Sequence, residues 1–459
     1  MKDNTIDLTR GGIPSKLLRF MLPVLLGNLI QEMYTLADTF IVGRLLGVNK
    51  LAAVGVAVSP HFFATGFIIG LFAGCGVVIS QHFGNGDMKG VKRAAAAAAM
   101  IASALMLLFT TGFCLAAEPL LRFINATPDV FDDASIYLRI LYLGLPAVAL
   151  YNLLASALRA VGDSKTPLYM LIGSSLLNIA LDTLFIGAFK MDVAGAAAAT
   201  VISQLVSGLL CLLYTLKRAR MLIPERDDWR SAGIMARSEL KIGVPLGFQW
   251  MIIAGGWMLL QGTLSGLGAD ATAAYTIVSR INSLVQNMLA SVGTVMATFV
   301  GQNAGAKKYS RIRTGVRYTM LASFIFAAAV GLMIYVFARE LTLLFIDRGA
   351  AEAEAVSSLV KNYTRISSPC LWLLGVIFIY RSATQGLGDG IVPMISSVVE
   401  LSMRWLIPVL FVSSLGFDAF ALANSGAWLL CAILVFTVYT VRMRARERGA
   451  KAPAPHGGA

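Results

Sequence analysis

The segment VGDSKTP at residues 161–167 recurs as LGDGIVP at residues 387–393, and this repetition decides the fold that we expect. The two segments lie at corresponding places in the two halves of the chain, and earlier landmarks such as Pro23 and Pro245 recur at nearly the same offset. Self-similarity through both halves of a chain is typical of membrane proteins built from two copies of one helical unit. The sequence therefore predicts a duplicated architecture.

Composition places both copies in a membrane. Hydrophobic residues make up 57% of the 459 residues, charged residues make up 14%, and the mean hydropathy is +0.73. An apolar run of about 20 residues is long enough to cross a hydrocarbon core of ~30 Å. Twelve such runs are expected, at about residues 17–46, 51–80, 93–117, 134–158, 167–189, 193–217, 239–267, 271–301, 314–338, 356–384, 392–415 and 417–442.

The number of spans fixes how the two copies are related. Because each copy has an even number of spans, both insert in the same orientation, related by a pseudo-two-fold axis along the membrane normal. We predict an all-α integral membrane protein of two homologous six-helix bundles. Its expected parts are an amino-terminal lobe at 1–222, a cytoplasmic linker at 223–238, a carboxy-terminal lobe at 239–445 and a disordered cytoplasmic tail at 446–459.

Charge indicates the sidedness of the chain. Most of the 38 Lys and Arg residues precede the first span or follow even-numbered spans, and Arg381 is counted among them. The opposite loops carry acids such as Asp129 and Asp347. By the positive-inside rule, both termini of this cell-membrane protein are cytoplasmic. The net charge of +13 is then explained by topology and anionic lipid, and no nucleic-acid partner is expected.

Two aspartates stand out because an uncompensated charge in the hydrocarbon core is energetically costly. Asp38 lies in LIQEMYTLADTFIVG and Asp182 in LLNIALDTLFIG, each about 10–12 Å from the outer end of its span at a rise of 1.5 Å per residue. Asn178 lies one helical turn before Asp182, and Thr200 lies at a similar depth in the sixth span. A carboxylate at this depth should bind a proton or be neutralised by a metal cation such as Na⁺.

The alternative is that these polar groups only join helices. Asn178 and Thr200 are suited to such hydrogen bonds, which are common between membrane helices. Asp38 and Asp182 favour function instead, because that lobe has no obvious intramembrane Lys or Arg to pair with them. We therefore predict an ion-coupling or proton-coupling site at these four residues.

A second polar group is expected in the other lobe. Glu400 and Arg404 lie one turn apart in the eleventh span, and Arg280 lies at a similar depth in the eighth. An internal salt bridge is the simplest account, and a second substrate or proton site is the alternative. The roles of Glu32 and His61 stay open.

The chain resembles the multidrug and toxic compound extrusion (MATE) family over nearly its whole length. The residues that carry the resemblance are LADTFIVGRLLG (36–47), ALRAVGDSKTP (157–167), NIALDTLFIG (178–187), GAAAATVISQ (195–204) and TQGLGDGIVP (384–393). The resemblance implies a V-shaped pair of bundles that exports amphipathic, often cationic, compounds in exchange for H⁺ or Na⁺. In the branch with its cation site in the amino-terminal lobe, the site residues match Asp38, Asn178, Asp182 and Thr200.

Three rival functions are weaker. A lipid-linked precursor flippase of a related fold would need a cavity with several cationic residues, and only Arg280 and Arg404 are expected inside the membrane. An enzyme would need a nucleophile with a base or a metal-ligand cluster, and neither is visible. A receptor or channel does not explain acids in one lobe alone. We expect a non-enzymatic antiporter without an organic cofactor that contacts lipid and small amphipathic molecules and works as a monomer.

Overall fold

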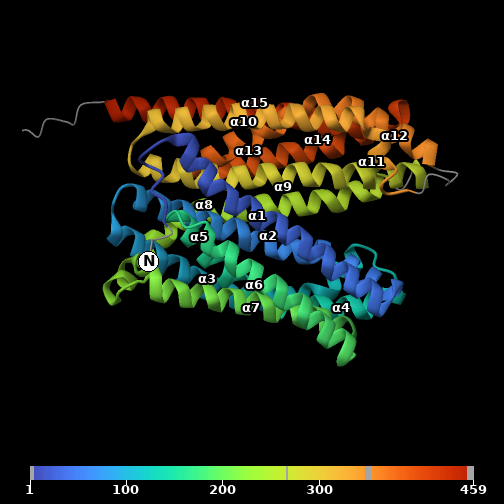
Figure 1. Cartoon of the computed structure of the whole chain (residues 1–459), viewed down its shortest axis with the longest axis horizontal. Coiled ribbons are helices and arrows are strands. Elements are labelled where there is room, and N and C mark those ends of the chain that lie inside the picture. Colours follow the sequence, from blue (N-terminus) through green and yellow to red (C-terminus); the bar gives the residue numbers. More distant parts are fainter. Residues whose placement is uncertain (1–4, 265–266, 347–352, 452–459) are drawn as a thin grey trace, which may run out of the picture. The chain divides into compact units, whose positions relative to one another are not determined.

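The computed structural model describes residues 5–264, 267–346 and 353–451, and every regular element in them is helical (Figure 1). The helices are α1 (Ile13–Leu46), α2 (Val48–Gly84), α3 (Met88–Phe123), α4 (Pro128–Leu143), α5 (Leu145–Ala160), α6 (Lys165–Asp182), η1 (Thr183–Ala188), α7 (Asp192–Arg218), η2 (Arg220–Leu222), α8 (Arg226–Leu264), α9 (Ala269–Gly305), α10 (Tyr309–Val336), α11 (Ala338–Thr342), α12 (Ala353–Ser367), η4 (Ser368–Cys370), α13 (Leu371–Gly386), α14 (Ile391–Leu415) and α15 (Asp418–Lys451).

These helices match the expected spans closely. Within the described residues, ten helical segments are long and apolar enough to cross a membrane, and the pair α4 and α5, bent by 45° at Gly144, makes an eleventh. The expected seventh span, 239–267, corresponds to α8, although residues 265 and 266 lie outside the described part. The prediction of an all-α membrane protein is confirmed.

Helix α8 begins earlier than the sequence suggests. Most of the expected linker, 223–238, is helical because α8 starts at Arg226. Asp227 and Asp228 in its first turn favour a helix N-terminus, where the backbone dipole attracts negative charge. The expected tail at 446–459 also starts as helix, since α15 continues to Lys451, and residues 452–459 lie outside the described part.

Contacts divide the chain into two units. The first contains Ser15–Met258, and the second contains Leu259–Ala459 together with Thr9–Pro14. Helix α8 opens the second copy of the repeat in sequence, yet as far as Met258 it is grouped with the first unit. The contacts place the boundary between Met258 and Leu259, whereas the repeat in the sequence places it at residues 223–238. The division into two lobes at residues 223–238 therefore stays a prediction.

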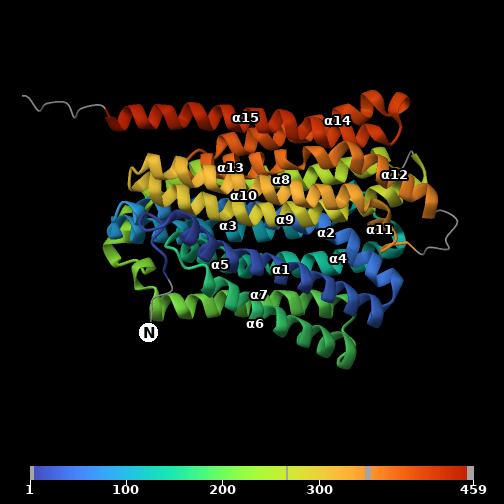
Figure 2. The same ribbon diagram turned by 45° about the horizontal axis from the view of Figure 1, so that its top comes forward.

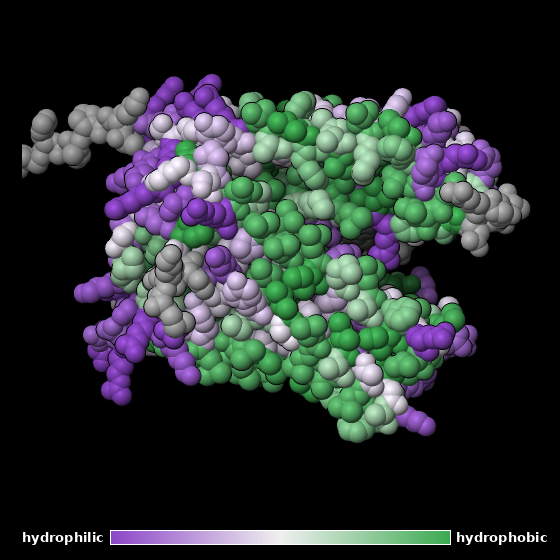
Figure 3. Space-filling view, in the orientation of Figure 1, coloured by the Kyte–Doolittle hydropathy of each residue, from purple (hydrophilic) through white to green (hydrophobic). Residues whose placement is uncertain are grey.

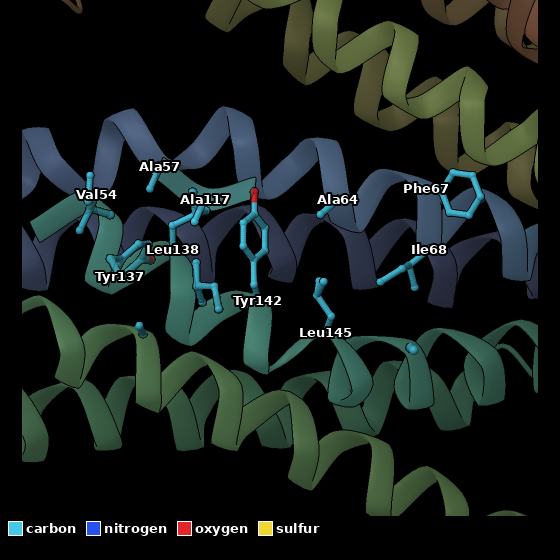
Figure 4. Packing of buried hydrophobic residues seen from close by; sticks show 14 of the residues in the cluster. Val54, Ala57, Ala64, Phe67, Ile68, Ala117, Tyr137, Leu138, Tyr142 and Leu145 are labelled. Atoms are coloured by element: carbon cyan, nitrogen blue, oxygen red, sulfur yellow. The ribbon is translucent and has the colours of Figure 1, made fainter. Parts of the chain in front are cut away.

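The core of the first unit forms where α4 meets α2 (Figure 4). Val54, Phe67, Leu138 and Tyr142 are all buried in one apolar cluster. The Tyr142 ring crosses from α4 toward α2, where its hydroxyl donates a hydrogen bond to the Pro60 carbonyl (3.0 Å). Such a bond satisfies the only polar atom that this buried side chain carries.

Glycines bring α2 and α8 into backbone contact. The sequences GLFAG (70–74) and GVPLG (243–247) both have the small-xxx-small spacing that lets membrane helices approach closely. A Cβ atom on Gly70 would lie 2.3 Å from the Leu246 carbonyl oxygen, and one on Gly74 would lie 2.3 Å from the Gly243 Cα. Only glycine fits at these two positions of α2.

The second unit has its own cores. One surrounds Trp428 and Leu374, and another surrounds Tyr363 and Phe420. The segment Thr9–Pro14 belongs to this unit, because the Lys308 Nζ donates to the Thr9 carbonyl (2.9 Å) and Arg311 to those of Gly11 (2.7 Å) and Arg10 (3.1 Å).

Both copies of the repeated segment form the same turn. Gly162 (φ 92°) and Gly388 (φ 91°) have positive φ angles, which L-residues with a side chain rarely adopt. The aspartate that follows each glycine then accepts hydrogen bonds from backbone N–H groups at the start of the next helix. Asp163 Oδ1 accepts from Thr166 N (3.0 Å), and Asp389 Oδ1 accepts from Ile391 N (3.1 Å). The repetition in sequence is therefore a repetition in local structure.

The surface of the helices suits a bilayer. Figure 3 shows apolar side chains along the middle of the helices and hydrophilic ones toward their ends. Figures 1 and 2 both show α6 beside α7, and these two helices are in contact. This pairing positions the polar site described next.

Candidate ion-binding site

The four predicted site residues lie in the first unit, on three helices. Asp38 is in α1, Asn178 and Asp182 end α6, and Thr200 is in α7. Asp182 and Asn178 are 0% and 1% exposed, and Asp38 is 9% exposed. Burial of two carboxyl groups in a membrane protein is expensive unless other groups or a cation compensate for it.

The structure brings all four residues together. The carboxyl groups of Asp38 and Asp182 lie within hydrogen-bonding reach of each other. With the amide oriented to satisfy both of its ends, Asn178 donates to Asp182 Oδ2 (2.9 Å) and accepts from the Thr200 backbone N–H (3.2 Å). Asn178 thus links α6 to α7 while it orients one of the two carboxyl groups.

Two tyrosines complete the surroundings of the carboxyl pair. Tyr34, one turn before Asp38 on α1, reaches the Thr200 side chain, and its hydroxyl is close enough to both carboxyl groups to interact electrostatically. Tyr137 on α4 is buried and interacts electrostatically with the same two carboxyl groups. The sequence analysis did not assign either tyrosine to the site. The position of Tyr34 one helical turn from Asp38 was the only available signal.

The local path of α6 changes at the site. Directly after Asp182 the chain forms the π-helix η1, in which each turn contains an extra residue. Short π-helical segments are rare and often occur at functional sites. Here η1 lies between Asp182 and the end of the span. A sharp turn with positive φ at Lys190 and Asp192 then leads into α7.

Three buried oxygen atoms at the site are available to a cation. Asp38 Oδ1, Asp182 Oδ1 and Thr200 Oγ1 are buried and have no well-formed hydrogen bond among the described residues. Buried oxygens without a hydrogen-bond partner are uncommon in folded proteins, because each one loses its hydration without compensation. A proton shared by the carboxyl groups, or a Na⁺ ion bound by oxygens, would satisfy them. No group of three or more His, Cys, Asp and Glu side chains in the described part could hold a metal ion.

The second predicted polar group has a different composition from the one expected. Glu400 binds Arg404 (Nη2 to Oε1, 2.7 Å) and also Arg381 (Nη2 to Oε2, 3.0 Å), whereas no ion pair of Arg280 occurs among the described residues. The expectation that Arg381 lies in a basic connection is wrong, because it is 6% exposed within α13. Arg381 was counted with the connection that follows because it lies near the end of the expected span 356–384, but it is buried within α13, where Glu400 neutralises it.

The repeat relates this ion-pair cluster to the aspartate pair. Arg404 follows Asp389 at the same spacing at which Asn178 follows Asp163. The second copy therefore places an arginine where the first has the asparagine that orients Asp182. The second unit thus has the fixed positive charge of Arg404 at the position equivalent to Asn178.

Another buried acid was missed by the sequence analysis. Glu239 in α8 is 0% exposed, and neither of its carboxyl oxygens has a well-formed hydrogen bond in the described part. The Cys75 thiol of α2 lies within hydrogen-bonding reach. Glu239 follows a charged stretch of sequence. Hydropathy therefore places it at the end of a span, where a charge is ordinary, and gives no sign that it packs against a neighbouring helix.

A family model, two curated relatives and a solved structure each match most of the chain. The MatE family model matches residues 23–184 and 245–410. The probable multidrug resistance protein YpnP of Bacillus subtilis is 28% identical, covering 94% of this chain and 96% of its own. A second probable multidrug resistance protein of the same organism, YoeA, is 30% identical over 71% of this chain and 72% of its own. A crystal structure of MATE in complex with MaL6 superimposes with a TM-score of 0.89 at 23% identity, covering 97% and 100% of the two chains.

Proposed function

The chain belongs to the MatE family, and we propose that it is a secondary antiporter that exports amphipathic compounds in exchange for a cation bound at Asp38 and Asp182. The multidrug resistance relatives support drug-like substrates. The observation that carries the proposal is the pair of buried, facing carboxyl groups with unsatisfied oxygens. Two such groups cannot both hold a negative charge in a low-dielectric site without a bound cation.

The amide of Asn178 can serve either ion. With its nitrogen toward Asp182 it supports a carboxylate, and with its oxygen toward Asp182 it can accept a hydrogen bond from the protonated carboxyl group or bind a metal cation. A Na⁺ ion would require the amide to turn over and present its oxygen. Thr200 Oγ1 would then be the other neutral oxygen available on α7.

Cation binding must be coupled to a change of access. A cation can drive transport only if its affinity differs between the outward-open and inward-open states. We propose that the lobes at 1–222 and 239–445 alternate around a central pathway in a cell membrane with both termini cytoplasmic. One chain is sufficient for the coupling site, because Asp38, Asn178, Asp182 and Thr200 all come from the same polypeptide.

Efflux of a fluorescent cationic dye from proteoliposomes tests this function. The wild type is compared with Asp38→Asn and Asp182→Asn under an imposed H⁺ or Na⁺ gradient. We expect each variant to lower gradient-driven efflux at least roughly tenfold, which corresponds to about 1.4 kcal/mol of lost coupling. The ion whose gradient drives wild-type efflux is the coupling ion.

Asp129→Asn is the matched control, since Asp129 is an exposed aspartate in the first turn of α4. It should transport as the wild type does. Thermal unfolding of each purified variant excludes loss of folded protein as the cause. Gradient-driven efflux that survives in Asp38→Asn at normal protein levels would refute the assignment of the site.

A further inference from the structure

The second unit contains a cavity that includes a cation without a partner among the described residues. Its volume is about 730 Å³, and its lining includes Thr272, Thr276 and Arg280 of α9 with Phe345 and Ile346 after α11. A cavity of this size is within the range of small-molecule sites. Arg280 is exposed, and no described carboxylate lies within ion-pair distance of it, whereas Arg381 and Arg404 of the same unit both bind Glu400.

The depth of Arg280 makes this arrangement unusual. It lies about three helical turns beyond Gly268, where α9 begins, and is therefore about 18 Å along the helix at ~1.5 Å per residue. This distance is more than half of a ~30 Å hydrocarbon core. A charged side chain at such a depth is expensive to place in lipid and normally faces a water-filled space or a charged partner.

The exposed face of α9 differs from that of a lipid-facing helix. After Ala269, its exposed positions follow a helical spacing and are mostly polar: Thr272, Thr276, Arg280, Leu284, Asn287 and Thr294. By contrast, the exposed positions of α10 include Leu321, Phe324, Ile325 and Leu332. The polar face of α9 therefore borders water or a ligand rather than hydrocarbon.

The chemistry of the cavity selects the charge of its ligand. The Thr272 and Thr276 hydroxyls donate to backbone carbonyls of their own helix (2.9 and 2.8 Å), so their oxygens only accept further hydrogen bonds. The Arg280 guanidinium is the strong donor, and its geometry suits a carboxylate or a phosphate. Phe345, 55% exposed, and Ile346 supply an apolar wall beside it.

We infer that this cavity is a substrate subsite for amphipathic organic anions, with the acidic head on Arg280 and the apolar body against Phe345 and Ile346. The inference rests on the proposed transport function, because it adds an anionic class to the substrates of that transporter. The first repeat has no arginine at the equivalent position. When the repeats are aligned on the glycine before each helix, Gly47 and Gly268, the counterpart of Arg280 is Ser59.

This assignment has an energetic consequence for coupling. Export of one organic anion in exchange for one entering cation moves two positive charge equivalents inward. An inside-negative membrane potential therefore drives both parts of the exchange. A cation exported for a cation would gain nothing from the potential at equal stoichiometry.

Equilibrium binding to the full chain in lipid nanodiscs tests the subsite without any gradient, so its outcome is independent of coupling. The probes share a pyrene body and a butyl chain and differ in their head: 1-pyrenebutyrate is anionic, 1-pyrenebutanol neutral and 1-pyrenebutylamine cationic. We expect the wild type to prefer pyrenebutyrate. Arg280→Gln should weaken pyrenebutyrate binding roughly tenfold or more, because a hydrogen bond to a charged group is lost. It should leave pyrenebutanol unchanged and should not weaken pyrenebutylamine, because a like charge is removed.

Two further variants keep the test informative. Arg280→Lys retains the charge and should retain most of the preference, whereas Phe345→Ala should weaken all three probes to a similar degree. Arg365→Gln is the matched control, because Arg365 is an exposed arginine of α12 outside the cavity lining, and it should bind as the wild type does.

Three results would overturn the inference. The first is unchanged pyrenebutyrate affinity in folded Arg280→Gln. The second is an equal loss for all three probes in that variant, which would indicate a structural role. The third is loss of the wild-type preference when phosphatidylglycerol replaces phosphatidylcholine in the nanodisc, because the occupant would then be an anionic lipid headgroup and not a substrate.

Discussion

Substitution of Gly74 by alanine should force α2 and α8 apart. The added Cβ would lie 2.3 Å from the Gly243 Cα and 2.5 Å from the Gly243 N, and both atoms belong to the backbone. Carbon atoms make optimal contact at about 3.5–4.0 Å, so the helices must separate by more than an ångström. No side-chain rotation can relieve the clash, since neither glycine has a side chain.

The size of the effect follows from two opposing terms. Overpacking of a well-packed contact costs about 1–3 kcal/mol, and the upper end applies here because the obstacle is backbone. Alanine in a helix is more favourable than glycine by about 0.5–1 kcal/mol, which offsets part of this cost. The net loss is therefore about 2 kcal/mol, or about 4–8 °C in Tm at ~2–4 °C per kcal/mol for a unit of 150–250 residues.

Gly55→Ala on the same helix is the control. Nothing lies within 4 Å of a Cβ at Gly55, so only the propensity term applies, and the Tm should rise by about 1–4 °C. Thermal unfolding of the two purified variants in one detergent measures both shifts. If Gly74→Ala raised the Tm as Gly55→Ala is expected to, the close approach of α2 and α8 would be wrong.

Two further predictions concern charge. Asp87 accepts a hydrogen bond from the Gly90 backbone N–H (2.8 Å), and this bond holds the pKa of its carboxyl below its usual range. The unfolded-state pKa of an aspartate is about 3.9. A lower pKa in the folded state stabilises the protein above that pH, and this stabilisation is lost as the pH falls through the folded-state pKa. The Tm difference between wild type and Asp87→Asn should therefore shrink below about pH 4. A difference that stays constant from pH 7 to pH 3 would contradict this. In the second unit, Glu400→Gln leaves two buried arginines without a counter-ion and should cost about 3–5 kcal/mol. Arg404→Met should cost less, because Glu400 keeps its bond to Arg381, and chemical denaturation that gave the reverse order would refute the shared-carboxylate account.

The sequence by itself determined the class of protein and most of its helices. Hydropathy acts locally, since each span must bury about 20 apolar residues whatever its neighbours are, and turn chemistry is local as well. Gly162 with Asp163, and Gly388 with Asp389, specify the same turn within a few residues. For the same reason, Asp38 and Asp182 could be recognised as site candidates before their partners were known, because a carboxylate in an apolar run is costly in any packing.

Only the tertiary structure decided which polar groups meet. Asp38 and Asp182 are far apart in sequence and approach each other because α1 and α6 are brought together in the first unit. Arg381, expected in a basic connection, is instead neutralised by Glu400 on the next helix. Such pairings depend on which helices are neighbours and on how each is rotated about its axis. One span's hydropathy and propensities contain no information on either, so the contacts that give these charges their chemistry are fixed only when the helices pack.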